Sequence, residues 1–454
     1  MRHSLEMDMC NGPLMGNLLR FSLPLMASGI LQLLFNAADI IVLGQFASSS
    51  AMAAVGATSS LNNLMVNLFL GLSIGGSVIM ARYCGARDWH HARETVHTAI
   101  LLAVLSGLLL IVVGIPTIPT LLRWMGTPEN VLDQAVLYMR IVFLGMPAMM
   151  VYDFGAGILR AVGDTRRPLI FLTIAGVANA CMNVVFVLGF HMDVAGVALA
   201  TALSQYLSAG LVVACLMQPG THYWLRPKHL RIHLPILLQI VQVGLPAGIQ
   251  GAVFSISNVL IQSSINGFGT YAVAGSTAGA NIEGFVYTAM NSVYQAALSF
   301  TSQNVGAGKK ERIPLILRDC LILVTIIGAA LGWFAVLFGR PLLSIYSSEP
   351  QVIEYGLQRI HVVCLTYLLC GLMDVTCGVI RGMGASVTPT IVSLTGACGL
   401  RVVWIFTVFV AMHSLFILYL SYPVTWVITW ASHMVCFAVL YRRKKLPAAA
   451  GQKN

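Results

Sequence analysis

The sequence predicts an all-α integral membrane protein with twelve transmembrane helices in two six-helix lobes related by an internal repeat. Three observations support this fold class. The 454 residues are 57% hydrophobic and only 9% charged, with a mean hydropathy of +0.82. A soluble domain carries roughly 25% charged residues, because its surface faces water. Apolar stretches long enough to cross a bilayer recur along the chain, and motifs of the first half return in the second.

A transmembrane helix needs about 20 apolar residues to cross the hydrocarbon core. In the first half such stretches cover 14–43, 52–80, 95–122, 132–160, 168–189 and 195–217. In the second half they cover 236–266, 272–303, 315–339, 350–381, 388–410 and 415–441. The expected domains are an N-terminal cytoplasmic segment over 1–13, an N-lobe over 14–217, a linker over 218–235, a C-lobe over 236–441 and a basic tail over 442–454.

Nearly all of the 26 Lys and Arg residues fall on one side of these spans. The other side receives only Arg123, Arg140, Arg340 and Arg359, and Arg401 lies inside a span. The positive-inside rule makes the basic side cytoplasmic, with both termini there. We expect a multi-pass protein of the plasma membrane, in a bacterium the cytoplasmic membrane. The net charge of +10 is then a consequence of topology, and nucleic acid is not an expected partner.

The two halves share a motif at a constant offset. Asp153-x3-Gly157-x2-Arg160-x2-Gly163-x4-Pro168 recurs 221 residues later, from Asp374 to Pro389, and Leu23-Pro24 recurs at Leu245-Pro246. Six spans per half place both halves in the same orientation, which is the arrangement of parallel repeats in transporters. We expect two bundles around a central cleft that opens to each side in turn.

Acidic residues inside spans indicate function, because burying a charge in lipid costs about 2.5–3.5 kcal/mol on insertion scales. In the first span Gln32, Asn36 and Asp39 share one helix face. Further polar residues lie at Asn179 and Asn183 in the fifth span and at Thr201, Ser204, Gln205 and Ser208 in the sixth. Together they predict a polar chamber in which Asp39 carries a proton. The alternative is a structural carboxylate bonded between helices.

The second half offers a substrate site or a second ion site. Glu283, Tyr287 and Asn291 follow one another at intervals of four residues, so they share a helix face. An acid beside aromatic rings suits an organic cation. Gln250 and Asn258 add polar groups on the seventh span, and Asp374 is a further acid. The tyrosines could equally be packing residues.

The repeat places an acid seven residues before an arginine in each half. Asp153 precedes Arg160, and Asp374 precedes Arg381, at the predicted cytoplasmic ends of two spans. We expect ion pairs that gate the cytoplasmic side. Arg401 needs a counter-charge that the sequence does not identify.

The sequence lacks the motifs of ATP-driven transporters, metal-binding proteins and common enzymes. No Gly-x4-Gly-Lys-Ser/Thr loop is present, which excludes the common ATP-binding motif. The ten scattered cysteines form no Cys-x-x-Cys pair, and no metal, cofactor or catalytic residue is expected. An ion gradient, of protons or sodium, remains as the energy source. The alternatives are a lipid-linked precursor flippase, a polytopic membrane enzyme and a channel.

Three motifs resemble those of multidrug and toxic compound extrusion (MATE) transporters. They are Gln32-x3-Asn36-x2-Asp39-x3-Leu43-Gly44, the run from Gly157 to Thr165, and Gln303-Asn304-Val305-Gly306-Ala307-Gly308. The resemblance implies efflux of drug-like small molecules, mostly cationic, coupled to proton or sodium entry, by a monomer in contact with membrane lipid.

The resemblance also implies an N-lobe cation site at Asp39, Asn179, Asn183 and Thr201. Asn183 stands where many members of the family have an acid. Glu283 and Asp374 correspond to the acids of members that have a C-lobe site.

Overall fold

The computed structural model describes residues 6–46, 49–125 and 127–443, and every regular element among them is a helix. This confirms the all-α prediction. The chain forms two compact units. The first contains the residues up to Met7 and Ala27–Gly248, and the second contains Asp8–Met26 and the chain from Ile249 onward. The predicted basic tail after residue 443 and the first five residues of the predicted N-terminal segment lie outside the described residues.

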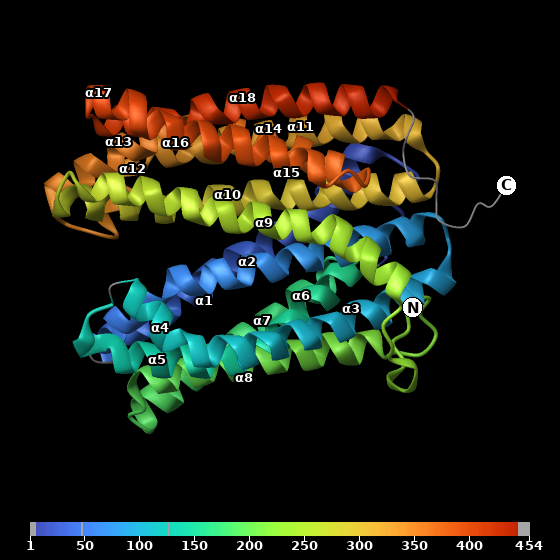
Figure 1. Cartoon of the computed structure of the whole chain (residues 1–454), viewed down its shortest axis with the longest axis horizontal. Helices are drawn as coiled ribbons and strands as arrows, with labels where there is room; N and C mark the ends of the chain where they lie inside the picture. Colours follow the sequence, from blue (N-terminus) through green and yellow to red (C-terminus); the bar gives the residue numbers. More distant parts are fainter. Residues whose placement is uncertain (1–5, 47–48, 126, 444–454) are drawn as a thin grey trace. The chain divides into compact units, whose positions relative to one another are not determined.

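The helices of the N-terminal half belong to the first unit, except that α1 belongs to it only from Ala27 onward (Figure 1). They are α1 (Leu14–Phe46), α2 (Ser49–Gly85), α3 (Trp89–Leu109), η1 (Leu110–Gly114), α4 (Ile115–Trp124), α5 (Glu129–Leu144), α6 (Met146–Ala161), α7 (Arg166–Asn183), η2 (Val184–Gly189) and α8 (Asp193–Leu216). The central helix is α6, which packs against α2, α3 and α8.

The helices of the C-terminal half belong to the second unit, except that α9 belongs to it only from Ile249 onward. In Figure 1, α10, α11 and α18 are drawn as long rods. The helices are α9 (Leu234–Asn266), α10 (Thr270–Gly306), η4 (Lys310–Arg312), α11 (Ile313–Leu337), α12 (Gly339–Ser344), α13 (Pro350–Thr366), α14 (Leu368–Gly382), α15 (Val387–Ser393), η5 (Leu394–Gly399), α16 (Leu400–Trp404), η6 (Ile405–Phe409), α17 (Val410–Met412) and α18 (Leu415–Arg442). Here α10 and α14 are central and pack against each other.

The predicted spans correspond to these helices. Among the described residues, nine helices are long and apolar enough to cross a membrane, and eleven spans result if each of two bent pairs counts as one. The bent pairs are α5–α6, at 46°, and α13–α14, at 44°. The remaining predicted span, 272–303, is α10, a continuous helix of 37 residues that is rich in small and polar side chains. Twelve spans are therefore consistent with the structure.

Glycines allow the first part of α9 to pack directly on α2 within the first unit. A Cβ atom at Gly71 would lie 2.1 Å from the backbone nitrogen of Gly248. A Cβ atom at Gly75 would lie 2.2 Å from the carbonyl oxygen of Ile240. Small residues let membrane helices approach to backbone contact. This contact explains why α9 up to Gly248 groups with the first unit although the rest of α9 does not.

Candidate functional site

A chain of hydrogen bonds links Asp39 on α1 to α7 and α8. The Asn183 side-chain amide donates to Asp39 Oδ1 at 2.5 Å and to Asn179 Oδ1 at 3.0 Å. Asn179 donates to Ser204 Oγ at 3.4 Å, and Ser204 Oγ donates to the Thr201 carbonyl oxygen at 2.8 Å. The structure thus brings together four predicted side chains with the backbone of a fifth predicted residue, Thr201.

Burial differs across this site. The exposed fractions of Asn179 and Asn183 are 6% and 1%, whereas Asp39 is half-buried and Asn36, on the same helix, is exposed. Asn183 Oδ1 is buried without a hydrogen-bond partner among the described residues. A buried unpaired acceptor costs about 1–3 kcal/mol. The site therefore holds an acceptor beside a carboxylate, an arrangement suited to a proton or a cation.

Local structure explains how α7 presents Asn183 to α1. Gly176 has no side chain where Phe35 of α1 packs, and a Cβ atom there would lie 1.9 Å from the phenylalanine ring. After Asn183 the helix continues as the π-helical segment η2. Such segments frequently occur at functional sites, because the wider turn redirects side chains.

An apolar cluster flanks the site. Val187, Val194 and Val197 are buried, and Val42 and Tyr138 pack against them. Val42 follows Asp39 by three residues on α1, and Val187 follows Asn183 by four, so the cluster lies about one turn beyond the polar groups. An apolar surrounding strengthens electrostatic interactions at the carboxylate.

The second half does not repeat this site. The π-helical segments η2 and η6 begin 221 residues apart, which fixes the correspondence near Asn183. The counterparts of Asp39 and Asn183, at offsets of 222 and 221, are Ile261 and Trp404. Ile261 is buried in an apolar cluster, and Trp404 packs against it. Among the described residues, the hydrogen-bonded chain from Asp39 to Thr201 therefore has no counterpart at Ile261 and Trp404.

Glu283 is engaged by an arginine that the sequence interpretation had assigned to a loop. Arg359 Nε donates to Glu283 Oε1 at 2.7 Å, and its Nη2 donates to Oε2 at 2.8 Å. Arg359 also donates to Ser276 Oγ at 2.9 Å, and Tyr419 donates to the same oxygen at 3.1 Å. Arg359 is 8% exposed, inside α13, so its assignment to the loops of the less basic side was wrong. The pair neutralises the acid, so Glu283 is not a free anion for an organic cation in this structure.

The other predicted second-half residues are spread over several helices. The rings of Tyr287 and Tyr367 lie 6.3 Å apart, and Tyr367 stacks on Trp426 at 5.3 Å. Asp374 is half-buried on α14, close enough for its charge to act on Tyr287. Asn291 is half-buried, whereas Asn258 is exposed. Asp374 and Tyr287 thus remain together, without Asn258.

The predicted gate ion pairs are absent among the described residues. Neither Asp153 and Arg160 nor Asp374 and Arg381 form an ion pair within 4 Å. The reason is geometric, since seven residues along a helix separate two side chains by two turns, about 10 Å.

Arg381 bonds instead to neutral partners. It donates to Tyr294 Oη at 2.6 Å, Gln250 Oε1 at 2.9 Å and Ser386 Oγ at 3.2 Å. Gln250 therefore binds Arg381. The Arg160 Nε and the Asp153 Oδ2 are buried without hydrogen-bond partners in the described part of the chain.

Arg401 contacts the aromatic ring of Tyr422, although the sequence had led us to expect a carboxylate as its partner. Its guanidinium lies 4.3 Å from the centre of the Tyr422 ring, and it donates to Thr425 Oγ1 at 3.5 Å. It is 2% exposed. Sequence reasoning missed Tyr422, Ser276 and the role of Arg359. A charge in the middle of the predicted span 350–381 was the available signal for Arg359, because such a charge requires a partner.

Comparison with known proteins agrees with this architecture. The MatE family model matches the chain twice, over residues 24–185 and 246–407. Probable multidrug resistance protein YoeA of Bacillus subtilis is 27% identical over 390 residues, which cover 84% of each chain. Probable multidrug resistance protein YpnP of the same organism is 26% identical over 400 residues, covering 87% of this chain and 88% of the relative.

A solved structure shares the fold. The outward-facing structure of a multidrug resistance MATE family transporter of the MOP superfamily superposes with a TM-score of 0.89 at 22% identity, covering 96% of this chain and 97% of the other. The two matches of the family model fall on the two halves of the internal repeat. The chain therefore belongs to the MatE family, the multidrug and toxic compound extrusion transporters that its motifs resemble.

Proposed function

We propose that this multidrug efflux protein is a secondary active antiporter that exports small organic, drug-like compounds in exchange for protons or sodium ions. The observation that carries the proposal is the Asp39 site. The half-buried Asp39 carboxylate accepts a hydrogen bond from Asn183, whose side-chain oxygen has no hydrogen-bond partner among the described residues. This pair of groups can take up and release one cation. Acids in membrane spans are functional by default.

We assign ion coupling to the first half and contact with the organic substrate to the second half. Its Glu283 is already paired with Arg359, and the counterparts of Asp39 and Asn183 are apolar. Asp39 is therefore our candidate for ion coupling. For an organic cation, Asp374 with the neighbouring Tyr287 is our candidate contact, since an aromatic face attracts a cation.

The proposal includes an orientation. Basic residues cluster at the segments that join α2 to α3, α6 to α7, α8 to α9 and α10 to α11. We place these segments and both termini in the cytoplasm by the positive-inside rule. Transport then proceeds by alternating access of the two halves, which the parallel repeat favours.

The test is efflux of a cationic dye from proteoliposomes with separately imposed proton and sodium gradients. The wild type should respond to one of the two gradients, which identifies the ion. Asp39→Asn should abolish the response, whereas Asp133→Asn, a change at an exposed acid of α5, should retain it. Gradient-driven efflux by Asp39→Asn at the wild-type rate would refute the role of Asp39.

A further inference from the structure

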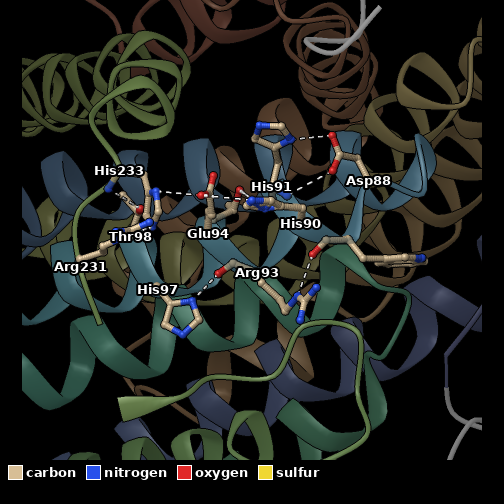
Figure 2. Close-up of polar contacts among 11 residues, drawn as sticks. Asp88, His90, His91, Arg93, Glu94, His97, Thr98, Arg231 and His233 are labelled. Atoms are coloured by element: carbon tan, nitrogen blue, oxygen red, sulfur yellow. Dashed lines mark hydrogen bonds and ion pairs between the residues drawn. The ribbon is translucent and has the colours of Figure 1, made fainter. Parts of the chain in front are cut away.

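The linker predicted over 218–235 corresponds in the structure to residues 217–233, the range for which we use the name from here on. It joins α8 to α9 and docks on α3 within the first unit (Figure 2). The Arg226 backbone N–H donates to His97 Nε2 at 3.1 Å. The His233 backbone N–H donates to Thr98 Oγ1 at 3.1 Å. His97 and Thr98 are buried. Two adjacent side chains of α3 thus hold both ends of the segment between Arg226 and His233.

The contacts of His97 determine its protonation state. A backbone N–H can only donate, so the Nε2 that faces Arg226 carries a lone pair. A carbonyl oxygen can only accept, so the Nδ1 that lies 2.6 Å from the Arg93 carbonyl carries the hydrogen. His97 is therefore neutral when the linker is docked. A proton on Nε2 would point at the N–H of Arg226 and remove the contact.

His233 makes side-chain contacts at the other end of the docked segment. Arg231 Nε, which can only donate, lies 3.2 Å from His233 Nε2. His233 Nδ1 lies 3.0 Å from Glu94 Oε1 on α3. Figure 2 shows both contacts, with the ring of His233 between Arg231 and Glu94. These side-chain contacts add to the backbone contact between His233 and Thr98 at this end of the docked segment.

The charged surroundings of His97 are mostly basic. On α3 its neighbours include Arg93, Glu94 and His90, and the linker adds Arg226, His229 and His233. The other titratable groups on the helices that pack against α3 are Arg82, Tyr83 and Cys84 on α2 and Tyr152, Asp153 and Arg160 on α6. Glu94 is the one acid among the neighbours on α3 and the linker, and it is already engaged by His233. A second positive charge at His97 would be poorly compensated.

We propose that the linker is a pH-sensitive latch that stays docked on α3 while His97 is neutral and is released when the solution on that face becomes acidic. The latch also holds the start of α9, since the Leu237 N–H donates to the His233 carbonyl at 2.9 Å. The regulatory role rests on the proposed function, whose orientation places the linker in the cytoplasm. An antiporter that imports protons acidifies the cytoplasm. Release of the latch then slows further antiport.

The docking is tested without transport. Hydrogen–deuterium exchange of the Arg226 and His233 amides is measured in nanodiscs at pH 7.5 and 5.5, and protection factors are corrected for intrinsic exchange. A free histidine titrates near pH 6.5, so excluding its protonated form from the docked state lowers protection by about tenfold over this range. Equal protection of these amides at the two pH values in the wild type would overturn the proposal, whether or not any variant folds.

Two variants assign the effect. His97→Gln keeps a side-chain acceptor for the Arg226 N–H and cannot titrate, so its protection should change less than about twofold. His229→Gln removes an exposed histidine of the same linker and should keep the tenfold change. A tenfold change in His97→Gln would overturn the role of His97.

Dye efflux at the two pH values on the linker face is then compared at a fixed driving gradient. Wild-type efflux should fall with acid, and His97→Gln efflux should not. An acid response of the amides with no difference in efflux between the two proteins would overturn the regulatory role. Loss of all efflux in the wild type would instead count against the proposed antiport.

Discussion

Replacing Glu283 should destabilise the protein more than it impairs a binding site, because its carboxylate is committed to Arg359. Both side chains are buried, at 5% and 8% exposed, and two hydrogen bonds of 2.7 and 2.8 Å join them. Removing one partner of a buried ion pair costs about 3–5 kcal/mol, because the other charge is left uncompensated. Glu283→Gln keeps one acceptor, and Arg359 keeps Ser276, so we expect the lower end, about 3 kcal/mol.

The measurement is the free energy of unfolding in mixed detergent and SDS micelles, followed by tryptophan fluorescence. The double variant Glu283→Met/Arg359→Met removes both charges and should recover to within about 1 kcal/mol of the wild type, since a buried pair can be replaced by apolar residues at little cost. A loss below about 1 kcal/mol in Glu283→Gln, together with abolished dye efflux, would refute this reasoning and return Glu283 to the substrate or ion site.

Four further changes test other parts of the structure. Asn183→Asp adds a second carboxylate beside Asp39, and because two such groups share one proton, the pH profile of efflux should move to higher pH; an unchanged profile would contradict the contact. Gly176→Ala should cost about 1–3 kcal/mol of unfolding free energy through overpacking against Phe35, and Phe35→Leu in the same chain should recover part of it. Arg381→Lys loses the fork that reaches three helices and should cost about 3 kcal/mol, with a loss under about 1 kcal/mol as the contrary result. Asp88→Ala removes the cap of α3 and should cost about 1 kcal/mol at pH 7.

The Asp88 prediction carries a pH dependence. Burial works to raise the pKa of Asp88, but hydrogen bonds from the side chain and backbone of His91 outweigh it and leave the pKa below its usual value of 3.8. A depressed folded-state pKa means that the stabilisation is complete above the unfolded-state value and is lost as the pH falls through the folded-state pKa. The difference in stability between wild type and Asp88→Ala should therefore be constant near neutrality and shrink below about pH 4.

The repeat and the spans could be predicted from local information. Hydrophobic length, charge asymmetry and motif spacing are properties of contiguous stretches, and the two matches of the MatE model confirm the repeat. The grouping of Asp39 with Asn179 and Asn183 was also within reach, since polar residues at helical spacing in a span must face other protein groups.

The ion-pair and hydrogen-bond partners of the buried charged residues could not be predicted in the same way. Glu283 and Arg359 are 76 residues apart, and no periodicity links them. The expected pairs at a spacing of seven followed from the repeat motif, but helix geometry places their side chains two turns apart. Arg381 binds Tyr294 and Gln250 from other helices, contacts that no local pattern encodes.

By itself, then, the sequence determined that the chain is a membrane protein of two related halves with polar side chains inside its spans, because the cost of placing polar groups in lipid constrains every span locally. Only the tertiary structure decided which buried charges neutralise one another, that the equivalent positions Ile261 and Trp404 lie in an apolar cluster, and that His97 holds the linker as a hydrogen-bond acceptor. These outcomes depend on which helices pack together, and packing brings side chains from distant segments within hydrogen-bond distance regardless of their separation along the chain.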